Sequence, residues 1–135
     1  MIPLHTVLRI NSVFSIISGA ALALGAEVLD EVIGVAALWL VGIGIGVVVF
    51  GVIVGRVAAQ RPVARKAAGA ILAADLAWVF GAAVLIFGLP DLLSTAGKWT
   101  LGVISLFVLD FATLQAFGLA RTGTMPDADN TGATL

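Results

Sequence analysis

Four long apolar runs divide this chain, and they constrain its fold more than any other feature. The runs cover residues 4–24, 32–54, 67–89 and 99–120. As a helix rising about 1.5 Å per residue, each run is about 30 Å long, which matches the hydrocarbon thickness of a bilayer. A helix satisfies its backbone hydrogen bonds within one segment, and the runs lack the alternation typical of strands. The sequence therefore predicts an all-α, four-transmembrane-helix bundle over residues 1–121 and a disordered tail over residues 122–135.

The composition leaves little room for a domain outside the membrane. Of the 135 residues, 61% are hydrophobic and 11% are charged, and the mean hydropathy is +1.17. With no cysteine and a single histidine, His5, the chain lacks the residues for a disulfide framework or a thiolate metal site. The net charge of −1 and the lack of a basic patch interleaved with aromatic residues argue against nucleic acid. We expect no metal, no cofactor and no nucleic acid, and the lipid bilayer as the main partner.

The basic residues lie almost entirely on one side of the four predicted spans. That side holds Arg9, Arg56, Arg61, Arg65, Lys66 and Arg121. The other side holds one basic residue, Lys98. Because basic residues near the ends of spans are retained in the cytoplasm, we expect both termini to be cytoplasmic.

Two aspartates interrupt the third and fourth runs. Counted from the expected cytoplasmic ends of their helices, Asp75 lies about 12 Å and Asp110 about 15 Å into the hydrocarbon. A carboxylate at such a depth costs about 2.5–3.5 kcal/mol on insertion scales, so both side chains are expected to face the bundle interior. The first run offers polar partners at similar depth on adjacent helix faces. The predicted polar cluster contains Arg9, Asn11, Ser12, Ser15, Asp75 and Asp110.

Two interpretations of this cluster stay open. In the first, the cluster is structural, because buried polar groups in a membrane pair with one another and fix helix register. In the second, Arg9 neutralises one aspartate and leaves the other without a counter-charge, which suits a proton or ion site. Gln115 lies about 140° round its helix from Asp110 and is expected to lie outside the cluster.

The second run carries glycines at the spacing of helix-packing motifs. They form the GxxxG pairs Gly42 with Gly46 and Gly51 with Gly55. A nucleotide-binding fingerprint is excluded because it requires a strand before the glycines and a helix after them. Small residues let helix backbones approach closely in lipid, so we expect packing within the bundle or between protomers. A glycine-lined ligand groove or pore wall is the alternative, since it needs the same bare surface.

Aromatic residues offer a further candidate site. Trp78 lies one helical turn from Asp75 on the same face, so it is the aromatic residue expected to face a ligand. Such a ligand would be a lipid, a quinone or a pigment. The alternative for Trp78 is ordinary packing.

The chain shows no set of residues for catalysis. The single His5 has no acid placed by sequence to orient it, and serines on transmembrane helices usually bond back to carbonyls of the preceding turn. Paired acids or histidines at metalloenzyme spacing are also missing from the sequence. We therefore expect the protein not to be an enzyme.

Two segments resemble those of small uncharacterised bacterial four-span integral membrane proteins. The segments are LRINSVFSIISG, residues 8–19, and ADLAWVFG, residues 74–81. The resemblance implies the bacterial inner membrane but brings no function. We expect an accessory or scaffolding subunit of a membrane complex, holding a lipid-like ligand and assembling as a homo-oligomer or with other membrane subunits. The alternative is a small proton- or ion-coupled transporter or channel that uses Asp75 and Asp110.

Overall fold

The structure, a computed structural model, describes residues 2–122, and all the regular secondary structure among them is helical. The elements are α1 (Leu4–Leu24), α2 (Ala26–Ile33), α3 (Ala37–Ala59), α4 (Arg65–Ala83), the π-helical turn η1 (Val84–Gly88) and α5 (Thr95–Thr122). Four of the described helices are long and apolar enough to span a membrane: α1, α3, α4 continued by η1, and α5. The predicted all-helical class with four candidate spans is therefore confirmed. The predicted tail lies outside the described residues from position 123 onward.

The second span differs from its prediction. It was expected over residues 32–54, whereas α3 runs over Ala37–Ala59, and the short helix α2 precedes it. Gly34 causes the later start, because it adopts a left-handed conformation (φ 80°) that ends α2. Glycine adopts this conformation easily because it has no side chain to clash with the backbone. Hydropathy does not register this break, because the residues around Gly34 are apolar.

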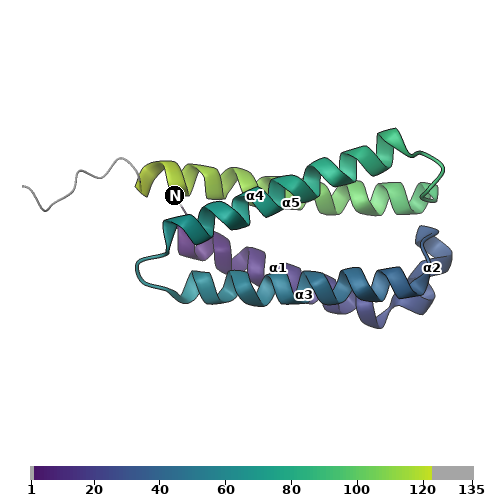
Figure 1. Ribbon diagram of the computed structural model, residues 1–135, viewed down its shortest axis with the longest axis horizontal. Coiled ribbons are helices and arrows are strands. Elements are labelled where there is room, and N and C mark those ends of the chain that lie inside the picture. Colours follow the sequence, from purple (N-terminus) through teal and green to yellow (C-terminus); the bar gives the residue numbers. More distant parts are fainter. Residues whose placement is uncertain (1, 123–135) are drawn as a thin grey trace, which may run out of the picture.

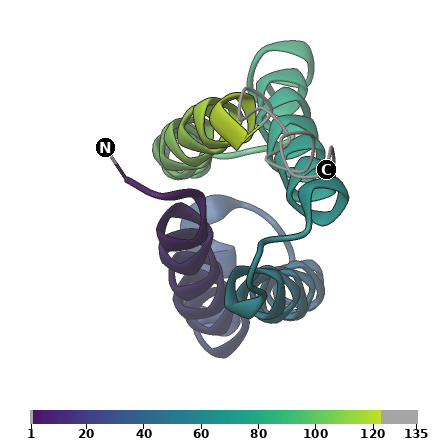
Figure 2. The same cartoon turned by 90° about the vertical axis from the view of Figure 1, so that its left-hand side faces the viewer.

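Two antiparallel hairpins make up the bundle. Helix α1 packs mainly against α3, and α4 packs mainly against α5, as the end-on view in Figure 2 shows. The backbones of α1 and α3 come close together at Gly19 and Gly44. A methyl group added at Gly44 would lie 2.6 Å from the carbonyl oxygen of Gly19. Glycine is needed on both sides because the two backbones almost touch there.

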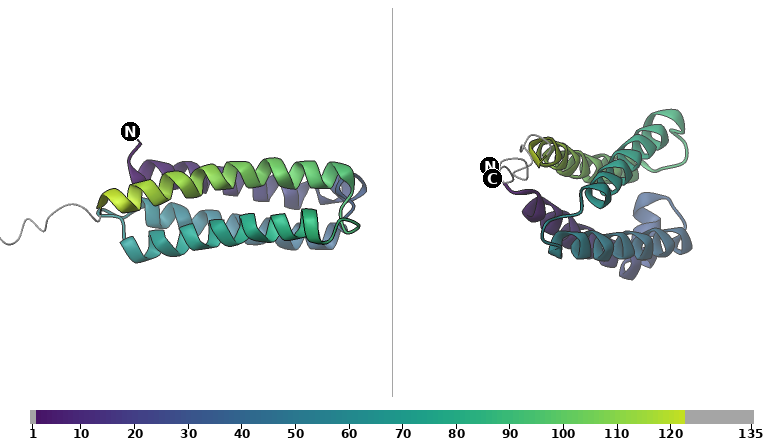
Figure 3. Two further views of the ribbon diagram at one scale, coloured as in Figure 1. Left: turned by 90° about the horizontal axis from the view of Figure 1, so that it is seen from above. Right: turned by 60° about the vertical axis from the view of Figure 1, so that its left-hand side comes forward.

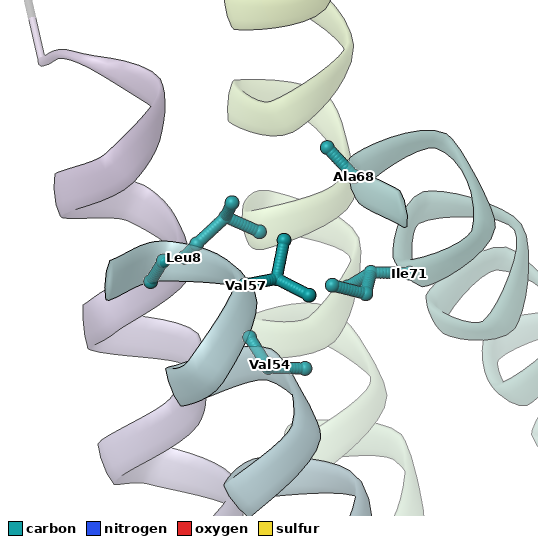
Figure 4. Packing of buried hydrophobic residues seen from close by; sticks show 6 residues of the cluster. Leu8, Val54, Val57, Ala68 and Ile71 are labelled. Atoms are coloured by element: carbon teal, nitrogen blue, oxygen red, sulfur yellow. The ribbon is translucent and has the colours of Figure 1, made fainter. Parts of the chain in front are cut away.

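A hydrophobic core closes the end of the bundle where α3 turns into α4. Its buried side chains are Leu8, Val54, Val57, Ala58, Ala68 and Ile71. Figure 4 shows α1, α3 and α4 converging on this cluster. Arg65 reaches across the same end and donates a 2.9 Å hydrogen bond from Nη1 to the carbonyl oxygen of Leu119, which ties the start of α4 to the last turns of α5.

The opposite end is held by hydrogen bonds around Ser94. Its hydroxyl donates to the carbonyl oxygen of Val32 at 2.6 Å and accepts from the backbone N–H of Gly97 at 3.0 Å. The first turn of α5 is thereby capped and fastened to the end of α2. From the core end toward the α2 end, α4 diverges from α3 (Figures 1 and 3). A cavity lies between the two hairpins toward the α2 end, where its lining includes Leu29 and Ile33.

Candidate ligand-binding site

Asp75 is buried at the junction of three of the four candidate membrane spans. Its side chain on α4 is 4% exposed. Asn11 on α1 donates from Nδ2, and Gln115 on α5 donates from Nε2, each at 2.8 Å to the same carboxylate oxygen, Oδ2. Ser15 donates to Oδ1 of Asn11 at 3.2 Å and so orients the Asn11 amide toward the acid. Asp75 therefore connects the two hairpins through a polar network inside an apolar bundle.

The other oxygen of Asp75 has a different environment. Oδ1 accepts no hydrogen bond from any residue that the structure describes. Asp75 also lines a cavity of about 590 Å³ that lies between the hairpins. One oxygen thus belongs to the polar network, and the other keeps its hydrogen-bonding capacity free of the described residues.

The predicted polar cluster forms only in part. Asn11, Ser15 and Asp75 come together, while buried Ser12 turns away and donates to the carbonyl oxygen of Gly51 on α3 at 2.7 Å. The inward placement of Arg9 and Asp110 is wrong, because both are exposed on the outer surface. Neither forms a hydrogen bond or ion pair with the described part of the chain.

The exposure of Asp110 follows from the geometry of α5. The buried positions of this helix are Gly97, Ser105, Ala112 and Gln115. At 100° per residue, Asp110 points well away from all of them. The insertion cost of a carboxylate does not by itself make Asp110 face the bundle interior. The packing of the whole helix determines which side of α5 faces inward.

Gln115 is the partner that the sequence prediction missed. It is 0% exposed and donates directly to Asp75, although the angle from Asp110 had placed it outside the cluster. The small residues Ser105 and Ala112 share its face and mark the packed side of α5. The angle around the helix axis between these small residues and Gln115 places Gln115 on the side of α5 that faces the bundle interior.

The walls of the cavity are almost entirely apolar. They include Phe14 and Leu22 from α1, Ile43, Gly46, Val47 and Phe50 from α3, Trp78 from α4 and Ile104 and Val108 from α5. Phe14 is held in place by Phe107 and Phe111, with ring centroids 5.7 and 5.4 Å apart. Trp78 lines the cavity as its spacing from Asp75 suggested, and its buried Nε1 has no hydrogen-bond partner among the described residues.

The four glycines proposed for helix packing fall into two groups. Gly51 and Gly55 lie against α1, where an added methyl group would come within 2.8 Å of Ile16 Cγ1 and 2.7 Å of Ser12 Oγ respectively. Around Gly42 and Gly46 an added methyl group would meet nothing within 4 Å. Of this second pair, Gly46 lines the cavity.

The cavity lining holds a single ionisable side chain, that of Asp75, and no basic side chain. Within residues 2–122, no group of three or more histidine, cysteine, aspartate or glutamate side chains could hold a metal ion. Comparison of the chain with protein-family models, with curated proteins and with solved structures finds no match. The functional argument therefore depends on the geometry of Asp75 and the cavity.

Proposed function

We propose that this protein is a non-catalytic integral membrane protein that holds a lipid-like ligand between its two helical hairpins and serves as an accessory or scaffolding subunit of a membrane complex. The observation that carries the proposal is the cavity of about 590 Å³ with apolar walls, lined by residues from all four candidate spans. Its volume falls in the range of small-molecule sites, about 300–1,000 Å³. A site within membrane-spanning helices is reached by molecules that dissolve in the bilayer.

The exposed Asp110 supports the role as a subunit. Its neighbours on the outer face of α5 are the exposed side chains of Leu106, Phe107 and Leu114. A carboxylate on an apolar, lipid-facing surface costs about 2.5–3.5 kcal/mol on insertion scales, and a polar or basic group on another helix would reduce this cost. A second copy of the chain or another membrane subunit fits this face.

The distribution of basic residues supports an orientation with both termini in the cytoplasm. The start of α1, the loop between α3 and α4 and the end of α5 lie at one end of the bundle. This end carries six of the seven basic residues, which favours its retention in the cytoplasm of a bacterial inner membrane.

The second candidate function is a small proton- or ion-coupled transporter. It is favoured by the unoccupied hydrogen-bonding capacity of Asp75 Oδ1 and by the position of Asp75 at the cavity. Asp110 does not belong to such a site, because it lies on the outer surface of α5. In proteoliposomes, a transporter would show a flux that Asp75→Asn abolishes and Asp110→Asn preserves, whereas the proposed subunit shows no flux.

A pair of glycine substitutions tests the proposed ligand site. Gly46→Phe directs a ring into open space at the cavity wall, and Gly42→Phe adds the same ring one turn away, where the cavity does not reach. Native mass spectrometry of protein extracted in mild detergent should find a lipid-like molecule bound to the wild type and to Gly42→Phe. The molecule should be lost from Gly46→Phe. No bound molecule in any of the three, or equal binding in all three, contradicts the proposal.

A further inference from the structure

We propose that the ligand of the cavity is a lipophilic organic cation, an amphiphile with a protonated amine or quaternary ammonium group, whose positive charge lies against Asp75. The inference rests on the proposed function and names the chemical class of the ligand. The observations that carry it are the hydrogen bonding of Asp75, the lack of basic residues in the cavity lining and the aromatic side chains that line the same cavity as the acid.

The hydrogen bonds of Asp75 leave its charge uncompensated. Both donors, Asn11 and Gln115, are neutral amides, and both bind Oδ2. They orient the carboxylate but add no positive charge. A buried charge needs a counter-charge, and the side chains that line this cavity offer none. A cation at Oδ1 would supply it, whereas a neutral ligand would supply a hydrogen bond at most.

The walls of the cavity suit an organic cation better than a metal ion. One carboxylate oxygen is too few for Ca²⁺ or Mg²⁺, which require about six oxygen ligands. Three aromatic side chains line the cavity, namely Phe14, Phe50 and Trp78. The faces of aromatic rings attract cations, most strongly where water is excluded. An apolar body would fill the remaining volume.

The route into the cavity is consistent with such a ligand. Figure 3 shows the hairpins spreading away from the end that the hydrophobic core closes. The α3 side of the cavity includes Gly46, which carries no side chain, and Ile43, which is 40% exposed. A lipophilic cation concentrates in the bilayer and would reach Asp75 from the membrane.

Equilibrium binding of two matched probes tests the inference. The cation is radiolabelled tetraphenylphosphonium, and the neutral comparison is triphenylphosphine oxide, which has similar rings and no net charge. Wild-type protein in nanodiscs should bind the cation at least about tenfold more tightly than the neutral probe. Asp75→Asn should weaken cation binding by about 30-fold or more, the usual result of removing one partner of a buried charge pair. Asp110→Asn removes the other intramembrane acid and should leave binding unchanged.

The outcomes separate the inference from the proposed function. If both probes bind alike, Asp75→Asn has no effect and Gly46→Phe blocks both probes, the cavity holds a ligand but the cation inference is overturned. If the wild type binds neither probe and no lipid-like molecule copurifies, both proposals fail. Should Asp75→Asn not fold, the preference of the wild type for the cation and its loss in Gly46→Phe but not in Gly42→Phe decide the question.

Discussion

Gln115 on α5 donates a 2.8 Å hydrogen bond to Asp75 on α4, and both side chains are almost completely removed from solvent. The contact lies inside the second hairpin, while Asn11 binds the same oxygen from the first hairpin. A single carboxylate oxygen therefore joins both halves of the bundle. Because the donors are neutral, this junction contributes hydrogen bonds and position without cancelling the charge.

The Gln115–Asp75 bond should be measurable by a double-mutant cycle. Gln115→Leu should lower the free energy of unfolding by about 1 kcal/mol, as expected for a hydrogen bond between membrane helices. In an Asp75→Leu background the same change should cost much less, because the acceptor is gone. Unfolding in mixed detergent micelles, followed by circular dichroism, gives both values. Thr113→Val is the control, since Thr113 is exposed and bonds to Leu109 of its own helix. Equal effects of Gln115→Leu in both backgrounds would contradict the contact.

The contact between Gly19 and Gly44 predicts that a side chain is poorly tolerated at position 44 and well tolerated at position 42 of the same helix. Gly44→Ala places a methyl group 2.6 Å from a backbone oxygen and 2.7 Å from the backbone nitrogen of Ala23, so α1 and α3 must separate. We expect a loss of about 1–3 kcal/mol in the free energy of unfolding. Gly42→Ala is the matched control and should be neutral or slightly stabilising, because nothing lies within 4 Å. Equal stability of the two variants in detergent unfolding would rule out this packing.

Hydropathy was sufficient to predict the number of helices long and apolar enough to span a membrane, because each long apolar run has few ways to satisfy its backbone in lipid. Depth in the bilayer and position on a helix face were sufficient to predict that Asn11, Ser15 and Asp75 lie together, because these polar residues fall at similar depth. Hydropathy failed where a single backbone angle decides the outcome, as at Gly34, which moves the start of the second span from residue 32 to Ala37.

The rotation of a helix about its own axis was the second limit of the sequence prediction. Insertion energy says that Asp110 is costly in lipid, but the packing of small residues on α5 decides which side faces the bundle. This packing turns Gln115 inward and Asp110 outward. The size and position of the cavity could not be predicted, because they depend on the divergence of two hairpins whose tilt the residue pattern does not record.

The hydroxyl of Ser94 should control the stability of the bundle end that contains α2. Ser94→Ala removes both the bond to Val32 and the cap on the N–H of Gly97. We expect a loss of about 0.5–2 kcal/mol, the usual cost of removing a serine cap, and faster hydrogen exchange at the first amides of α5. Thr95→Ala is the control, because Thr95 is exposed at the adjacent position. Unchanged exchange at Gly97 in Ser94→Ala would show that the cap does not hold this end.

Asp110 should matter for assembly and not for the fold of the single chain. Asp110→Leu replaces an exposed acid on the apolar face of α5, so insertion of this helix should become more favourable by about 3 kcal/mol. If the acid meets a polar or basic group on another subunit, the same change should reduce the size of the complex seen on native gels after extraction in mild detergent. Leu106→Val alters the same face without changing charge and should leave the complex intact. A complex of unchanged size in Asp110→Leu would show that this face of α5 takes no part in the proposed assembly. Loss of membrane insertion in the same variant would contradict the exposure of position 110 to lipid.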